Sequence, residues 1–268
     1  MLFYLILLIA DLFLWFILLK ELRERNGILR IAVLLVKTTV SAIFIFLFFR
    51  IILYRGEFAD PANAFRQIQM GVIGLLLVAS ASTCLVLTLA IRLVSRLMGR
   101  KYGGTGAANS ILFVLFVLLV ADGYFRQRLD IRTVRQELKV EGLDPALEGM
   151  KIALISDLHI SSWHDSYGKL DRAMRSISEE QPDILVNTGD FITFGWQEFG
   201  GSDTILRKAR AIAGAFAVEG NHDDGTYYPE YNEEYGEASR EMVSQKIEAS
   251  GYSLLRDTAV ILNHRGTA

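Results

Sequence analysis

Three short polar clusters in the second half of the chain combine residue types that could do chemistry. They are Asp157 and His159 in "SDLH", Asp190 in "GD", and Asn221, His222 and Asp223 in "GNHD". Carboxylate oxygens, imidazole nitrogens and amide oxygens are ligands suited to Mn, Fe, Zn or Mg. If the fold brings the clusters together, they predict a site for divalent cations.

Each cluster directly follows a segment that reads as a β-strand. The apolar stretches "KIALIS", "DILVN" and "AFAVE" end where the three clusters begin, and Leu170, Met174 and Ile177 recur at helical spacing between the first two. Alternating strands and helices predict a parallel sheet covered by helices. Ligand sites in such sheets form beyond the carboxyl ends of the strands, so the three clusters should share one edge.

Further elements are expected around these strands. They are a strand at "LKVEG", a helix with Ile205, Leu206, Ala209 and Ile212 on one face, a helix near Ala238–Ala249, and strands near Tyr252–Leu254 and Ala259–Asn263.

The spacing of a sheet suits a pair of metals. Neighbouring strands lie about 4.8 Å apart, and paired catalytic metals are about 3.5–4 Å apart. Asp190 comes from the middle cluster in chain order and is the candidate to bridge two ions, while Gly189 and Gly220 allow sharp turns beside it. Taken alone, Asp157 or Asp190 would be assigned as a helix N-cap, so the prediction depends on all three clusters occurring in order.

In that order, the clusters resemble the first three signature blocks of the calcineurin-like metallophosphoesterases, in the branch whose members are membrane-attached or exported. The resemblance covers about Thr133 to the end of the chain. It implies a four-layer α/β/β/α sandwich and metal-dependent attack of water on phosphorus, in line with the leaving group. It also implies roles for the polar residues: Asp157 and His159 bind one metal, Asp190 bridges both, Asn221 binds the second, His222 protonates the leaving-group oxygen or steadies the phosphoryl oxygens, and Asp223 orients His222.

The later histidine-containing blocks of that family have no counterpart here. After Asp223 only His264 remains, without the family's glycine-histidine context. We therefore expect the chain to be the N-terminal portion of a longer protein. With both metal shells incomplete, weak metal binding and little turnover are expected.

The first half of the chain is strongly apolar. Four runs are about long enough to cross a bilayer, with three crossings as the alternative: Met1–Leu19, Ile31–Phe49, Gly71–Ile91 and Gly103–Ala121. They predict a transmembrane helical region at 1–125, a linker at 126–131 and the first part of a metallophosphoesterase domain at 132–268. Asp11 and Lys37 would lie at similar depths, which predicts an interhelical ion pair.

Charge limits the classes of partner. Lys and Arg total 28 against 30 Asp and Glu, a net charge of -2, so no basic field is present to recruit nucleic acid. The charges flanking the spans favour an extracytoplasmic catalytic domain by one residue. The expected partners are membrane lipid and a phosphate mono- or diester, or a lipid-linked phosphate or pyrophosphate.

Three functional hypotheses follow. The first is a membrane-anchored phosphoesterase with two divalent metal ions. The second is a non-catalytic protein whose incomplete phosphoesterase domain binds or senses a partner. The third is a small transporter or channel, which the scarcity of polar residues in the apolar runs disfavours.

Overall fold

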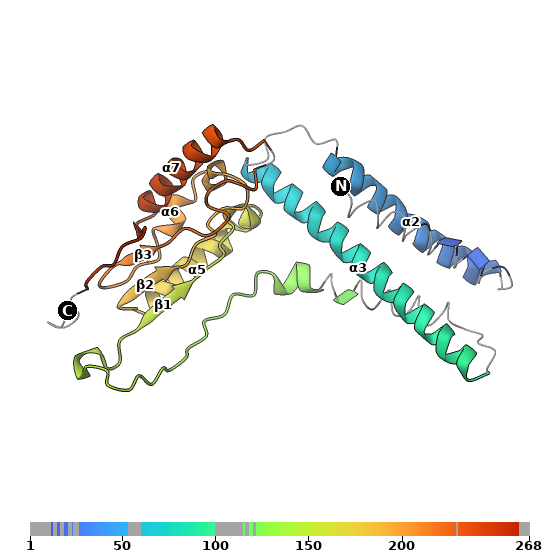
Figure 1. The fold of residues 1–268 in the computed structure, drawn as a ribbon, viewed down its shortest axis with the longest axis horizontal. Coiled ribbons are helices and arrows are strands. Elements are labelled where there is room, and N and C mark those ends of the chain that lie inside the picture. The colour runs from blue at the N-terminus through green and yellow to red at the C-terminus, as the bar shows by residue number, and fades with distance from the viewer. Residues whose placement is uncertain are drawn as a thin grey trace. The chain divides into compact units, whose positions relative to one another are not determined.

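The computed structural model describes residues 27–52, 60–99, 122–228 and 230–262, together with isolated positions before residue 120. It contains two compact units (Figure 1). One comprises Met1–Arg55 and Gln69–Asp130, and the other comprises Gly56–Ile68 and Ile131–Ala268.

Two long helices lie in the first half of the chain. Helix α2 runs over Gly27–Ile52 and α3 over Pro61–Leu97, and the short π-helix η1 spans Gly123–Gln127. In the part of the chain that the structure describes, no helix combines the length and the apolar character that a membrane crossing requires.

The predicted four-span bundle, and with it the multi-pass placement in a membrane, is therefore wrong. The runs Ile31–Phe49 and Gly71–Ile91 do fall within α2 and α3, but a crossing needs about 20 predominantly apolar residues in one helix, and the described helices do not meet that requirement. Most of Met1–Leu19 and Gly103–Ala121 lies outside the described residues.

The predicted ion pair of Lys37 cannot be followed in the structure, because Asp11 also lies outside the described residues. Lys37 Nζ donates a hydrogen bond to Ser41 Oγ at 3.0 Å, one turn along α2.

The second unit is built on a four-stranded sheet. Strands β1 (Ile152–Ile155), β2 (Ile184–Asn187), β3 (Ala215–Ala217) and β4 (Ser253–Leu254) lie in chain order. Every neighbouring pair is parallel. The predicted parallel sheet is thus confirmed, as are the strands expected at "KIALIS", "DILVN", "AFAVE" and Tyr252–Leu254.

Two expected strands are not formed. The described residues of "LKVEG" and of Ala259–Asn263 adopt no strand, and Asn263 lies outside the described residues. Leu138 and Val140 are 74% and 58% exposed. Alternating apolar residues stabilise a strand when the face that carries them is buried, whereas here both apolar side chains stay exposed.

Helices α5 (Tyr167–Glu179), α6 (Asp203–Leu206) and α7 (Glu233–Ala249) follow the first three strands. Short 3-10 turns complete the unit: η2 (Pro145–Leu147), η3 (Ile160–Trp163) and η4 (Trp196–Phe199). At the start of α7 the Asn232 side chain accepts from Tyr235 N at 2.8 Å, with Glu233 and Glu234 in the first turn. Both features favour a helix N-terminus. The helical face expected through Ile212 ends early, because α6 stops at Leu206.

The helices cover only one face of the sheet. Side chains on that face, such as Leu185 and Ala217, pack with Leu170 of α5, Leu206 of α6 and Val243 of α7 in one apolar core.

The opposite face of the sheet is exposed along β1, whereas Ile184 of β2 on the same face is buried, at 8% exposure. Ile152 and Leu154 of β1 point to this face and are 61% and 66% exposed. A second sheet stacked on this face would complete the predicted α/β/β/α sandwich, but the residues that the structure describes form only the one sheet.

Candidate metal centre

The chain leaving β1 stays paired with the chain leaving β2. Asp157 N donates to Gly189 O at 3.0 Å, and His159 N donates to Asp190 O at 2.9 Å. Asp157, His159 and Asp190 have φ values of 53°, 41° and 57°, in the left-handed region that non-glycine residues adopt at a cost of about 1–3 kcal/mol. These backbone bonds hold the polar residues in place against that cost.

The chain leaving β3 meets Asp190 from the other side. At Gly189, with φ +101°, an added Cβ would lie 2.2 Å from Gly220 N. At Gly220 it would lie 2.1 Å from Asp190 Oδ1. Only glycine permits this approach, which brings the second and third clusters into contact.

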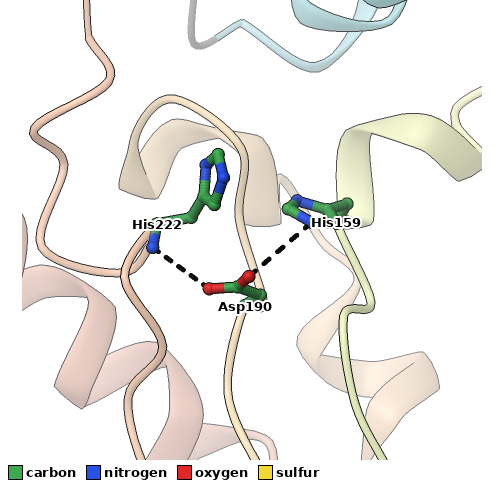
Figure 2. A group of neighbouring side chains, drawn as sticks. All are labelled: His159, Asp190 and His222. Carbon is green, nitrogen blue, oxygen red and sulfur yellow. Dashed lines mark hydrogen bonds and ion pairs between the residues drawn. The ribbon is translucent and has the colours of Figure 1, made fainter.

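The result is a compact group formed by His159, Asp190 and His222 (Figure 2). Each offers one ligand atom, and these atoms all lie within 4.8 Å of one another. His159 Nε2 is 3.9 Å from Asp190 Oδ2, and His222 N donates to Asp190 Oδ1 at 3.1 Å. The two imidazole rings lie edge to face with centroids 4.9 Å apart.

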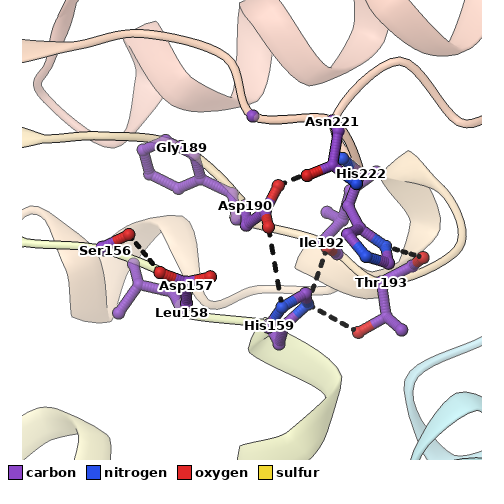
Figure 3. Close-up of polar contacts among 12 residues, drawn as sticks. Ser156, Asp157, Leu158, His159, Gly189, Asp190, Ile192, Thr193, Asn221 and His222 are labelled. Carbon is purple, nitrogen blue, oxygen red and sulfur yellow. Dashed lines mark hydrogen bonds and ion pairs between the residues drawn. The ribbon is translucent and has the colours of Figure 1, made fainter.

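Both histidines are oriented by one segment of backbone (Figure 3). His159 Nδ1 lies 3.0 Å from Ile192 O and 3.2 Å from Thr193 Oγ1. His222 Nδ1 lies 2.9 Å from Thr193 O. A carbonyl oxygen can only accept, so the proton of each neutral ring sits on Nδ1. Each Nε2 then keeps a lone pair for a metal or a substrate.

This geometry fits a metal ion. Zinc binds imidazole nitrogen and carboxylate oxygen at about 2.0–2.2 Å, so two such atoms in a tetrahedral site lie about 3.4 Å apart. His159 Nε2 and Asp190 Oδ2 lie 3.9 Å apart, so a small closing movement of these side chains would bring both onto one ion. The donor set also suits Mn or Fe.

Asp223 is fully buried beneath the group, at 0% exposure. Its carboxylate accepts from the backbone N–H of Asp190, Gly220 and Phe191 at 2.8, 2.9 and 2.9 Å, and from that of Ile192 at 3.2 Å. Burial raises the pKa of Asp223 to about 6, against the opposing effect of these hydrogen bonds. Asp223 thus ties the backbone of the second cluster to that of the third. Its predicted role of orienting His222 stays a prediction.

The other two predicted ligands lie beside the group. The Asp157 carboxylate accepts from Ser156 Oγ, and Asp157 is not a member of the compact group. Asn221 Nδ2 donates to the hydroxyl of Tyr227 at 3.0 Å, which leaves the amide oxygen free to face another partner. Figure 3 shows Asn221 next to Asp190. Ligation by Asp157, His159, Asp190 and Asn221 stays a prediction.

Sequence reasoning missed three residues near the site. Thr193 contacts both histidines, Glu198 binds the backbone N–H of Thr193, and the Tyr227 ring stacks on His222 with centroids 4.0 Å apart. The motif spacing gave no signal for Thr193 or Glu198. Tyr227 belongs to the tyrosine-rich stretch "DDGTYYPEY" directly after the third cluster.

Comparisons with known proteins match the part of the chain that carries the three polar clusters. Residues 150–266 match the profile of the family described as calcineurin-like phosphoesterase. The chain is 32% identical over 99 residues to the uncharacterized metallophosphoesterase YkuE of Bacillus subtilis, which is 36% of this chain and 34% of the relative. It is 41% identical over 83 residues to the UDP-2,3-diacylglucosamine pyrophosphatase LpxG of Chlamydia muridarum, 30% of this chain and 25% of the relative.

A third relative is a transmembrane protein with metallophosphoesterase domain from Danio rerio, 24% identical over 120 residues, 45% of this chain and 27% of the relative. The matched segment thus spans between a quarter and about a third of the length of these relatives. No solved structure matches the chain. The segment 150–266, which carries all three polar clusters, is thus similar to the calcineurin-like phosphoesterase family.

Proposed function

We propose that the chain is a metal-dependent phosphoesterase that hydrolyses a phosphate ester or pyrophosphate bond at a centre of two divalent metal ions. One observation carries the proposal: His159, Asp190 and His222 follow three successive parallel strands and place their ligand atoms within 4.8 Å of one another. The match of residues 150–266 to a phosphoesterase family supports it.

The proposed ligands are Asp157 and His159 for one ion, Asp190 between both ions, and Asn221 for the second. The contact of Gly220 with Asp190 supports the bridging role, because it sets this carboxylate between the other two clusters. When bound, the ions would neutralise charge on the phosphoryl oxygens and make water available as a nucleophile near neutral pH.

His222 is proposed to act on the leaving group. The carbonyl oxygen of Thr193 accepts from its Nδ1–H at 2.9 Å in both the neutral and the protonated ring. The protonated ring can donate its Nε2 proton to the leaving-group oxygen. In the neutral ring the Nε2 lone pair points into the site instead, and His222 then serves as a further ligand.

The substrate class follows from the relatives rather than from a binding pocket. LpxG is named as a pyrophosphatase acting on a nucleotide-linked diacyl sugar, and its similarity to this chain is 41% over 83 residues. We therefore propose a lipid-linked pyrophosphate as the first substrate to try, with simple phosphate diesters as the alternative.

Hydrolysis of bis-p-nitrophenyl phosphate by the 268-residue chain in excess Mn²⁺ tests the proposal. Turnover should disappear with EDTA and fall at least about 100-fold in Asp190→Asn. Glu237→Gln, on the exposed side of α7, is the control and should match the wild type. Hydrolysis that is absent from the wild type at any Mn²⁺ concentration, or that survives Asp190→Asn, would refute the proposal.

A further inference from the structure

Glu198 is a buried acidic residue that the proposed chemistry does not use. It lies in η4 and is 0% exposed. Its carboxylate accepts from Thr193 N at 3.0 Å, from Phe194 N, and from Gly195 N at 3.1 Å. A buried acidic side chain is costly unless hydrogen bonds compensate it, and here all three named donors are consecutive backbone N–H groups.

The three N–H groups belong to the segment that orients both histidines. Ile192 O and Thr193 Oγ1 face His159 Nδ1, and Thr193 O faces His222 Nδ1 (Figure 3). The segment is held from two sides, because Asp223 accepts from Ile192 N at 3.2 Å while Glu198 accepts from Thr193 N. Glu198 therefore fixes the side of the loop that carries the Thr193 carbonyl.

We propose that Glu198 is a positioning residue for the metal centre. By binding the N–H groups of Thr193, Phe194 and Gly195, it aims the carbonyl oxygens of Ile192 and Thr193 at the two histidines. Both rings then keep their proton on Nδ1 and turn Nε2 toward the site. The consequence for metal affinity rests on the proposed function, whereas the consequence for the tautomers rests on the geometry alone.

A purely structural role predicts something different. If Glu198 only stabilised the unit, its replacement would lower the melting temperature and leave the tautomers of the folded protein unchanged. Glu198→Met separates the two roles, because Met keeps a similar length and offers no comparable acceptor for the loop. Glu198→Gln is the conservative partner. One amide oxygen can occupy the position of Oε1, which already accepts from Thr193 N and Gly195 N at 3.0 and 3.1 Å.

The experiment is side-chain ¹⁵N NMR of the metal-free chain, followed by calorimetric titration with Mn²⁺. In the wild type, His159 and His222 should each show a single neutral tautomer with the proton on Nδ1. Glu198→Met should populate the Nε2–H tautomer of at least one ring and weaken Mn²⁺ binding about 10–100-fold. Glu198→Gln should restore the wild-type tautomers and come within about threefold of wild-type affinity.

Val243→Ala is the matched control for lost stability. Val243 is buried on α7 in the apolar core, so the variant should melt earlier with unchanged tautomers. Should Glu198→Met fail to fold, Glu198→Asp replaces it, because the shorter side chain draws the carboxylate away from the loop, and the same shifts are expected.

Unchanged tautomers and Mn²⁺ affinity in a folded Glu198→Met or Glu198→Asp variant would overturn the proposal, as would a wild-type ring protonated on Nε2. A wild type that binds no Mn²⁺ but whose tautomers change in Glu198→Met would refute the proposed function and leave the positioning role intact.

Discussion

Gly220→Ala is the sharpest steric test of how Asp190 is placed. A Cβ at Gly220 would lie 2.1 Å from Asp190 Oδ1 and 2.5 Å from Asp190 N. Real Cβ contacts stay at or above 3.0 Å, so Oδ1 has to move by 0.9 Å. The backbone nitrogen cannot move freely, because it donates to the buried Asp223 carboxylate at 2.8 Å. The substitution therefore displaces the carboxylate proposed to bridge the two ions.

The expected loss follows from that displacement. A misplacement of about 1 Å can cost about 100-fold in rate, which corresponds to about 2.7 kcal/mol of transition-state stabilisation. Overpacking at a close backbone contact should also lower the free energy of unfolding by about 1–3 kcal/mol. Turnover should thus fall further than the loss of folded protein explains, because most of the protein remains folded after such a loss.

The assay is Mn²⁺-dependent hydrolysis of bis-p-nitrophenyl phosphate, with urea unfolding measured on the same preparations. Gly168→Ala is the matched control, since a Cβ at this position in α5 meets nothing within 4 Å. It should keep wild-type turnover and gain about 0.5–1 kcal/mol in stability. If Gly220→Ala retained turnover within about threefold of the wild type, the inferred position of Asp190 would be wrong.

Three further predictions concern neighbouring residues. Asp223→Asn should destabilise the protein by about 2–4 kcal/mol in urea unfolding, because its amide nitrogen would face backbone N–H donors in place of a charged acceptor. Stability within about 0.5 kcal/mol of the wild type would contradict the four N–H contacts. Tyr227→Phe removes the acceptor for Asn221 Nδ2 and keeps the ring over His222. The Mn²⁺ affinity measured by calorimetry should therefore fall about two- to tenfold. An unchanged affinity would show that the hydroxyl does not position Asn221. Burial raises the pKa of Glu198 from its ordinary 4.5, so folding favours the protonated carboxyl. The resulting stabilisation of the folded state is present below pH 4.5 and is lost as pH rises through the folded pKa. Urea unfolding should therefore show wild-type stability falling relative to Glu198→Gln as pH rises above 4.5, and a constant difference would contradict this sign.

The convergence of the three clusters could be predicted from the sequence. "SDLH", "GD" and "GNHD" each follow an apolar run, and parallel strands bring their carboxyl ends to one edge. The pairing of β1, β2 and β3 in chain order bears out that reasoning. The pair Gly189 and Gly220 was also readable, because a close approach of two backbones requires residues without a Cβ.

The support beneath the clusters could not be predicted in the same way. Glu198 reaches back to Thr193 within a loop whose path depends on Asp223, 25 residues further along the chain, and no periodic pattern encodes such a contact. The expected strand at Leu138 and Val140 failed for a related reason, since alternation predicts a strand only where one face finds cover. In the first half of the chain, apolar composition was mistaken for membrane-spanning helices, which the described residues do not form.

The most direct test is the structure of a crystal of the 268-residue chain soaked in Mn²⁺, with the ion located by anomalous scattering. The account predicts a manganese peak bonded to a carboxylate oxygen of Asp190, with His159 Nε2 in the same coordination shell at about 2.0–2.3 Å. A second peak is expected on the side of Asp190 that faces Asn221. A peak that Asp190 does not contact, or no peak within the group of His159, Asp190 and His222, would contradict it.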